Sequence, residues 1–189
     1  MNTLFCKRIN EVASLIDQMN TELLSDRIKV AIDILVDALK VRRPVLICGN
    51  GGSSSDATHI AGELVGRFMR DRPAYNVIAL SVNTSVITAW ANDYDYESVF
   101  SRQVEAHGQA GAVLWGISTS GNSSNVLRAM SIAREMGMNT IGLTGAGGGK
   151  MAALCDVLLD VPSDITPRIQ EMHIVIYHFI CEQIEAKLG

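Results

Sequence analysis

Residues 44–53 read Pro-Val-Leu-Ile-Cys-Gly-Asn-Gly-Gly-Ser, a short apolar run that ends in a glycine-rich turn. The next residues repeat apolar side chains at helical spacing, so this stretch predicts a strand, a tight turn and a helix. Four later apolar runs also end in small or hydroxyl residues, and they cover 77–80, 113–117, 140–143 and 157–161. Continuous apolar strands that alternate with helices are typical of a parallel sheet covered on both faces. We therefore predict an α/β fold, a doubly wound three-layer α/β/α sandwich with a five-stranded parallel sheet.

Three further helices are predicted outside this repeating pattern. Residues 3–24 place apolar side chains at the spacing of an amphipathic helix. Residues 26–41 differ, because their polar side chains form one narrow stripe and apolar side chains cover the rest. A helix that is apolar over most of its circumference is buried on several sides, which favours a subunit interface. The last helix is expected from about residue 166 to residue 188.

The length and composition indicate one domain that must bury an excess of apolar side chains. The chain has 189 residues, of which 48% are hydrophobic and only 19% are charged. Disordered chains show the opposite balance, and no apolar stretch is long enough to span a membrane. We expect a single domain over residues 1–189, with N-terminal helices in 1–42 that serve oligomerisation and a doubly wound core in 44–189. A covered sheet and the seam between subunits would then hold the apolar excess.

Charge and cysteine content exclude several classes of partner. The net charge is −4 and no cluster of Lys and Arg occurs, so nucleic acid is not expected as a partner. The N-terminus lacks the apolar run of a secretory signal, and no membrane partner is expected. The cysteines are widely scattered without CxxC spacing, so buried free thiols in a reducing cytoplasm are expected. They are Cys6, Cys48, Cys155 and Cys181.

Two polar loops follow predicted strands and begin helices, at the edge where parallel sheets bind ligands. They read Gly49-Asn50-Gly51-Gly52-Ser53-Ser54-Ser55 and Ser118-Thr119-Ser120-Gly121-Asn122-Ser123. Glycines let the backbone approach an anion, and hydroxyls with helix-start N–H groups can bind it, so the loops indicate a phosphate site. The alternative is that they are ordinary connections, as we interpret a third glycine-rich loop at 144–150. The motifs GxxxxGK[ST] and, after a strand, GxGxxG are absent, which disfavours NTP hydrolysis and dinucleotide binding.

Titratable side chains gather on one face of each of two predicted helices. After the first loop these are Asp56, His59, Glu63, Arg67 and Arg70. A solvated polar face would have the same pattern, but His59 and Glu63 are also spaced as a pair of metal ligands. In the last helix the shared face carries Glu171, His178, Glu182 and Glu185, with Gln170 at its edge. Buried His and carboxyl groups need partners, so that face indicates a site or a polar seam between subunits.

Several motifs together carry a family resemblance over nearly the whole chain. They are Cys-Gly-Asn-Gly-Gly-Ser at 48–53, Asp56, His59 to Glu63 with Gly-Arg-Phe at 66–68, Ala-Asn-Asp-Tyr at 91–94, Phe-Ser-Arg-Gln-Val-Glu-Ala at 100–106, Gly116 to Asn125, and Arg-Ile-Gln-Glu-Met-His at 168–173 with His178. In this order they resemble the sugar isomerase (SIS) domain family, and within it the phosphoheptose isomerases. The resemblance implies the SIS fold, which is flavodoxin-like.

The resemblance also implies an activity, a cofactor and an assembly. The expected reaction converts sedoheptulose 7-phosphate to D-glycero-D-manno-heptose 7-phosphate through an enediol(ate), toward lipopolysaccharide or capsule heptose. The expected assembly is a cytoplasmic homotetramer with active sites at subunit interfaces. One zinc ion per subunit is expected on the residues His59, Glu63, Gln170 and His178, of which Glu63 and His178 match the acid–base pair. Substrate contacts carry over to Asn50, Gly51, Gly52, Glu63, Asn92, Asp93, Ser118, Thr119, Ser120, Ser123 and Gln170.

Two questions stay open at the level of sequence. Gln170 and His178 are eight residues apart, about 12 Å along one helix, so Gln170 is expected either at the metal or at the sugar. The main alternative function is a non-enzymatic SIS relative that binds the replication initiator DnaA. That type lacks the acid–base pair, so the presence of Glu63 and His178 favours an enzyme. A SIS sugar-phosphate sensor is a second alternative, but it usually carries a separate DNA-binding domain.

Overall fold

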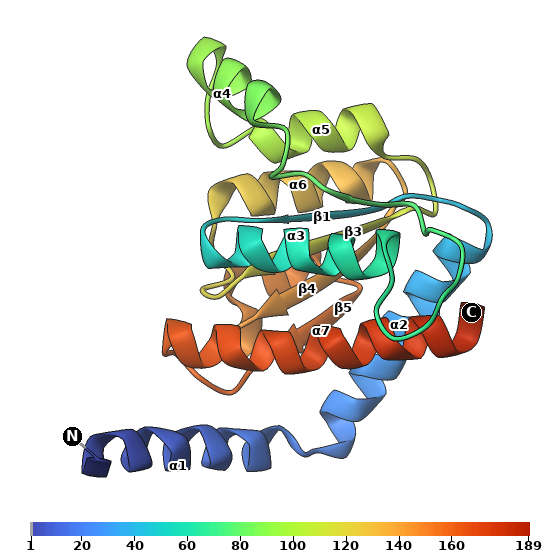
Figure 1. The fold of residues 1–189 in the computed structure, drawn as a ribbon. Helices are drawn as coiled ribbons and strands as arrows, with labels where there is room; N and C mark the ends of the chain where they lie inside the picture. Colours follow the sequence, from blue (N-terminus) through green and yellow to red (C-terminus); the bar gives the residue numbers. More distant parts are fainter. Residues whose placement is uncertain (1) are drawn as a thin grey trace.

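The sheet at the centre of the molecule has five parallel strands in the order β2-β1-β3-β4-β5 (Figure 1). The structure is a computed structural model that describes residues 2–189. The strands are β1 (Val45–Gly49), β2 (Val77–Ala79), β3 (Val113–Ser118), β4 (Asn139–Thr144) and β5 (Val157–Asp160). Each lies within one residue of its predicted bounds, so the predicted parallel sheet is confirmed.

Helices cover both faces of this sheet and form two further layers. One layer holds α2 (Glu22–Lys40), α3 (Gly52–Val65) and α7 (Thr166–Leu188), and the other holds α5 (Val99–His107), α6 (Ser124–Glu135) and the 3₁₀ segment η1 (Ala146–Leu154). Side chains alternate along β1, since Val45 and Ile47 pack with the first layer and Leu46 and Cys48 with the second. The three-layer sandwich is therefore confirmed.

The N-terminal helical pair is present, but its break lies earlier than predicted. Helix α1 (Asn2–Met19) ends at residue 19 and not at the predicted residue 24, and α2 begins directly after Thr21. The Thr21 hydroxyl accepts a hydrogen bond from the Leu24 N–H at 3.2 Å, so Thr21 is a helix N-cap. The apolar spacing that continues through Leu23 concealed this start signal. None of the described helices combines the length and apolarity that a membrane span requires.

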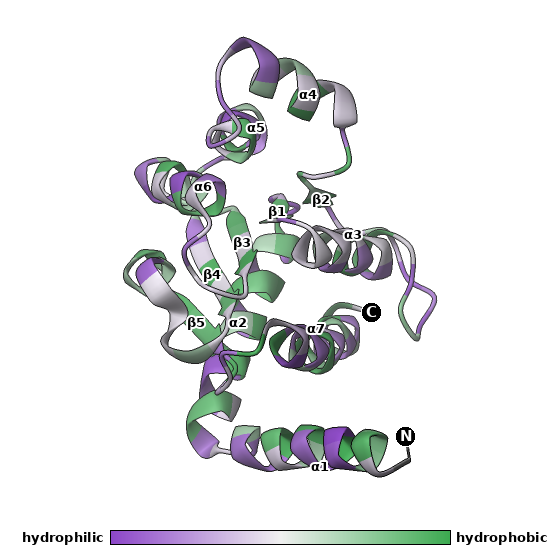
Figure 2. Cartoon of the chain, turned by 90° about the vertical axis from the view of Figure 1, so that its left-hand side faces the viewer, coloured by the Kyte–Doolittle hydropathy of each residue, from purple (hydrophilic) through white to green (hydrophobic). Residues whose placement is uncertain are grey.

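The cysteine prediction holds in part. All four thiols are free, and Cys48 and Cys181 are buried, while Cys155 is half-buried. Burial raises the pKa of Cys48 to about 12, which keeps this thiol protonated and unreactive. The prediction was wrong for Cys6, which is exposed because it lies on α1, away from the sheet (Figure 2).

The strand order fixes where a ligand site can form. Strand β1 lies beside β3, and the chain leaves these two strands toward opposite edges of the sheet. Ligands bind at such a switch point, beyond the carboxyl ends of the strands. The loop after β1 and the loop after β3 both lie there, which places the two polar loops of the sequence next to each other.

Candidate active site

The loop after β1 is fixed by a pair of side-chain amides. Asn50 and Asn125 each donate to the other's side-chain oxygen, at 2.8 and 2.9 Å. The Asn50 oxygen also accepts the Tyr96 hydroxyl at 3.0 Å. Gly51 has a φ of 55°, a left-handed conformation that favours glycine, and α3 begins at the next residue. The backbone N–H groups at this helix start can face an anion.

The loop after β3 carries hydroxyls beside the first loop. Ser118 is buried, and its hydroxyl lies 2.9 Å from that of Ser123. The third glycine-rich loop supports this one from behind, since a Cβ at Gly149 would approach the Ser120 carbonyl to 2.5 Å. Asn122 accepts the Lys150 N–H at 3.1 Å, which joins the same two loops. The second loop is therefore held in shape by its neighbour.

Three titratable side chains converge between α3 and α7, which lie side by side and run in the same direction (Figure 1). His59, Glu63 and His178 each offer one ligand atom, and these atoms lie within 4.8 Å of one another. Nε2 of His59 is 2.9 Å from Oε1 of Glu63, and the two imidazole rings meet edge to face at 5.1 Å. The expected pair of His59 and Glu63 is therefore joined by His178 from α7.

The surroundings of His178 favour a neutral ring. Burial lowers the pKa of His178 and nearby His59 lowers it further, whereas the Glu63 carboxylate acts in the opposite direction. The Phe68 ring lies 5.4 Å away and covers the imidazole. Nε2 of His178 is buried and has no hydrogen-bond partner among the described residues. An unpartnered imidazole nitrogen beside a second His and a carboxylate is a donor set that fits zinc.

Two residues that the sequence did not assign to the site stand behind His59. The Tyr177 hydroxyl is 2.9 Å from Nδ1 of His59. Asp56 is 8% exposed, and burial raises its pKa to about 6, although His59 and Tyr177 lower it. Asp56 lies one helical turn before His59 and Tyr177 directly precedes His178, so sequence position was the available signal for both.

Gln170 lies at the loop end of α7. Its side-chain amide rests against Gly52, where a Cβ would overlap Nε2. That position is two helical turns before His178, beside the start of α3. Within one chain Gln170 therefore lies against the first loop, and its role as a metal ligand stays a prediction.

Asn92 and Asp93 lie at the end of α4 (Thr84–Asp93), a helix that stands outside the layers (Figures 1 and 2). Both are exposed, and the Asn92 amide donates to the Asp93 carboxylate at 2.9 Å. Neither is hydrogen-bonded to the two loops within the described residues. Their roles as substrate contacts stay a prediction.

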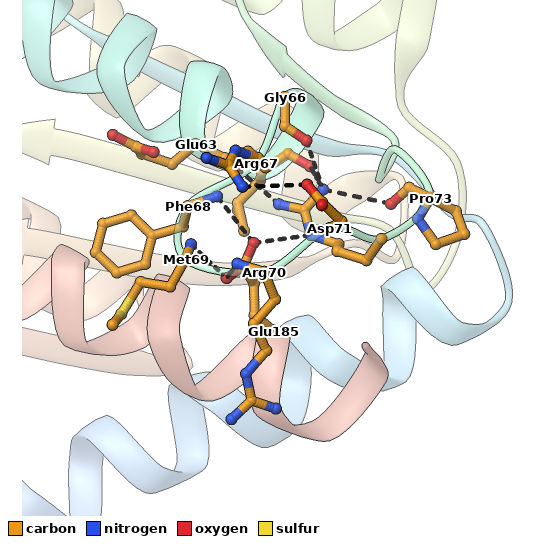
Figure 3. A network of polar contacts seen from close by, with 11 residues as sticks. Glu63, Gly66, Arg67, Phe68, Met69, Arg70, Asp71, Pro73 and Glu185 are labelled. Atoms are coloured by element: carbon orange, nitrogen blue, oxygen red, sulfur yellow. Dashed lines mark hydrogen bonds and ion pairs between the residues drawn. The ribbon is translucent and has the colours of Figure 1, made fainter.

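A buried ion pair fixes the end of α3 (Figure 3). The side chains of Arg72 and Glu185 are each 1% exposed and meet at 3.0 Å. Glu185 accepts the backbone N–H groups of residues 68–70, while Arg72 donates to the carbonyl of Glu63 at 2.6 Å. The expectation that Glu185 belongs to a site or a subunit seam was wrong, because its partners lie within this chain.

Comparisons with known proteins agree with this architecture. Residues 8–145 match the model of the SIS domain. A phosphoheptose isomerase of Helicobacter hepaticus is 55% identical over 166 residues, which cover 88% of this chain and 85% of the relative. The chain belongs to the phosphoheptose isomerase family. Another member, from Akkermansia muciniphila, is 52% identical over 155 residues and 82% of each chain. Among solved structures, the phosphoheptose isomerase GmhA from Neisseria gonorrhoeae superposes with a TM-score of 0.91 at 41% identity over 98% of each chain.

Proposed function

We propose that this chain isomerises sedoheptulose 7-phosphate to D-glycero-D-manno-heptose 7-phosphate. The observation that carries the proposal is the cluster of His59, Glu63 and His178, two of which lie on α3, the helix that begins at the first of the two loops suited to phosphate. Membership of the phosphoheptose isomerase family supports the same substrate. The product would supply heptose to a lipopolysaccharide core or a capsule.

The chemistry needs a base at a carbon and a proton donor near the carbonyl oxygen, because a proton moves between C1 and C2 through an enediol(ate). Glu63 is half-buried and its backbone is held by Arg72, so its carboxylate is a positioned base. His178 faces it and acts as the proton donor. Because the pKa of His178 is lowered, the ring is neutral near pH 7 and donates from its imidazole N–H.

His59, Glu63 and His178 would hold one zinc ion per subunit, with Gln170 as the candidate fourth ligand. When bound, such an ion supplies a Lewis acid that stabilises negative charge on the substrate oxygen. The unpartnered Nε2 of His178 is the feature of this chain that supports the assignment. The Phe68 ring packs against the same imidazole, with 5.4 Å between the ring centroids.

The two loops would bind the phosphate end of the substrate. Their backbone N–H groups and hydroxyls are neutral donors, so the phosphate is held without a fixed positive charge and can leave. The residues assigned to this end are Asn50, Gly51, Gly52, Ser118, Thr119, Ser120 and Ser123, with Gln170 beside them. Asn92 and Asp93 are assigned to the sugar.

A cytoplasmic homotetramer with active sites at subunit interfaces completes the proposal. Large apolar side chains are exposed along α1 and α7, and Figure 2 shows α1 lying apart from the sheet. They are Leu4, Phe5, Ile9, Ile16, Ile174, Val175 and Phe179. A second copy of the chain would cover them, and it could bring Asn92 and Asp93 toward a site.

The direct test is to incubate the purified protein with sedoheptulose 7-phosphate, with and without added zinc, and to measure the aldose product. We expect conversion that is lost when a chelator removes the metal. Absence of product under both conditions, together with capture of purified DnaA, would contradict the proposal and indicate the non-enzymatic alternative.

A further inference from the structure

Tyr177 occupies an unusual position for a core tyrosine. It is fully buried, and its ring packs edge to face against both imidazoles, at 5.5 Å from His59 and 4.9 Å from His178. Its hydroxyl is 2.9 Å from Nδ1 of His59. A phenylalanine would supply the same packing, so the hydroxyl has a separate role that concerns His59.

Two tautomers of His59 fit this contact, and they differ in which nitrogen keeps a lone pair. A neutral imidazole carries one N–H, and its other nitrogen keeps a lone pair. If Nδ1–H donates to the Tyr177 oxygen, the lone pair lies on Nε2, on the side of Glu63. The Tyr177 hydroxyl must then give its own proton to another acceptor.

Asp56 supplies that acceptor. It lies beside Tyr177, one turn before His59 on α3, and its Oδ2 is buried without a hydrogen-bond partner among the described residues. A buried carboxylate oxygen without a partner is costly, and the Tyr177 O–H is the donor that faces it. The groups thus form a row from Asp56 through Tyr177 to His59.

We propose that Tyr177, with Asp56 behind it, is a positioning residue that holds His59 with Nε2 free to bind a divalent metal ion. Partners behind a ligating His commonly fix its tautomer in this way, and their loss typically weakens metal binding 10- to 100-fold. The inference rests on the proposed metal-binding role of His59, Glu63 and His178.

The test measures zinc affinity directly, by competition with a chromophoric chelator on the purified full-length protein. We expect Tyr177→Phe to weaken zinc binding about 10- to 100-fold. Tyr75→Phe is the matched control, because it also removes a buried hydroxyl, but the Tyr75 hydroxyl has no hydrogen-bond partner among the described residues. Circular dichroism and thermal unfolding of both variants report whether each is folded. An unchanged zinc affinity in folded Tyr177→Phe would overturn the proposal.

A double-mutant cycle tests the role of Asp56. If Asp56 acts through Tyr177, Asp56→Asn weakens zinc binding in the otherwise unaltered chain and adds nothing to Tyr177→Phe. If the two losses of zinc affinity multiply in the double variant, Asp56 acts independently of Tyr177. That result would overturn the proposed arrangement of Asp56, Tyr177 and His59.

Activity is assayed separately, so the two proposals can fail separately. Conversion of the sugar by a protein that binds no zinc would leave the proposed reaction standing and overturn the role of Tyr177. A protein that binds zinc, loses affinity with Tyr177→Phe and does not convert the sugar would support the positioning role and contradict the proposed reaction.

Discussion

Glu63 is the residue on which the proposed chemistry depends most directly. Replacing it with Gln keeps its size but removes the base, so we expect kcat to fall about 10²- to 10⁴-fold. The fold and the binding of inorganic phosphate should change little, because the loops that bind phosphate lie at the other end of α3. Steady-state kinetics and calorimetry with phosphate measure the two effects. A fully active variant would exclude Glu63 as the base.

Gln170 distinguishes the two ends of the site. Its amide rests against Gly52, so we expect Gln170→Ala to raise KM about fivefold to tenfold through a lost hydrogen bond to substrate. The zinc affinity of the same variant tests Gln170 as the candidate fourth ligand, because an unchanged affinity would confine its role to the substrate. A large loss of zinc affinity would instead place Gln170 at the metal in the assembled protein.

Only part of the site could be predicted from the residues themselves. His59 and Glu63 are four positions apart on one helix, so spacing alone suggested their pairing. His178 joined them through the family resemblance. Tyr177 was not predicted, because a tyrosine in an apolar helix has the pattern of a core residue and its partner is 118 residues away.

At the scale of elements, the pair of Arg72 and Glu185 makes the fold sensitive to acid. Burial alone would raise the pKa of Glu185, but hydrogen bonds from Met69, Phe68 and Arg70 and the charge of Arg72 outweigh it. The pKa therefore lies below its ordinary value of 4.5. The unfolded chain binds this proton more readily, so the contribution to stability is present above about pH 4.5 and is lost as pH falls through the folded pKa.

Urea unfolding of Glu185→Gln tests this dependence. At pH 7 we expect a loss of about 3 kcal/mol, because Arg72 is left buried without its charged partner. The difference from the unaltered chain should shrink as pH falls below 4.5. Glu182→Gln, an exposed change on the same helix, is the control and should have little effect. A difference that grows in acid would contradict the assignment.

The elements themselves were largely predictable, because strand and helix patterns are local. All five strands and α7 follow from apolar runs and periodicity. The break between α1 and α2 was misplaced because the apolar spacing continues across the Thr21 cap. The pairing of Glu185 with Arg72 joins α7 to a loop that is distant in sequence, and no local pattern indicates it.

For the whole molecule we expect an oligomer. Phe179 is 47% exposed on α7, among other apolar side chains that a single chain leaves uncovered. Sedimentation velocity should show a tetramer for the unaltered protein, and Phe179→Glu should shift it toward smaller species. Far-UV circular dichroism checks that the variant is folded. A stable monomer of the unaltered chain would contradict this use of the apolar surface.

The composition predicted that apolar surface would be buried, but it could not predict which surfaces would cover it. The sheet accounts for one share, as the two buried clusters on its faces demonstrate. The exposed apolar surface of α1 and α7 is another share, and we propose that a second copy of the chain covers it. Asn92 and Asp93 also lie outside the layers, and the proposed assembly would bring them toward a site.

The matched course of α3 and α7 limits how this protein can vary. Gly52 meets Gln170 and His59 meets Tyr177, so one offset of 118 residues holds over two helical turns. One inserted or deleted residue in α7 between these contacts would turn the rest of the helix by about 100° and carry His178 off its face. We therefore expect this segment to tolerate substitutions far better than insertions or deletions. Relatives with an insertion or deletion in this interval should have lost the reaction.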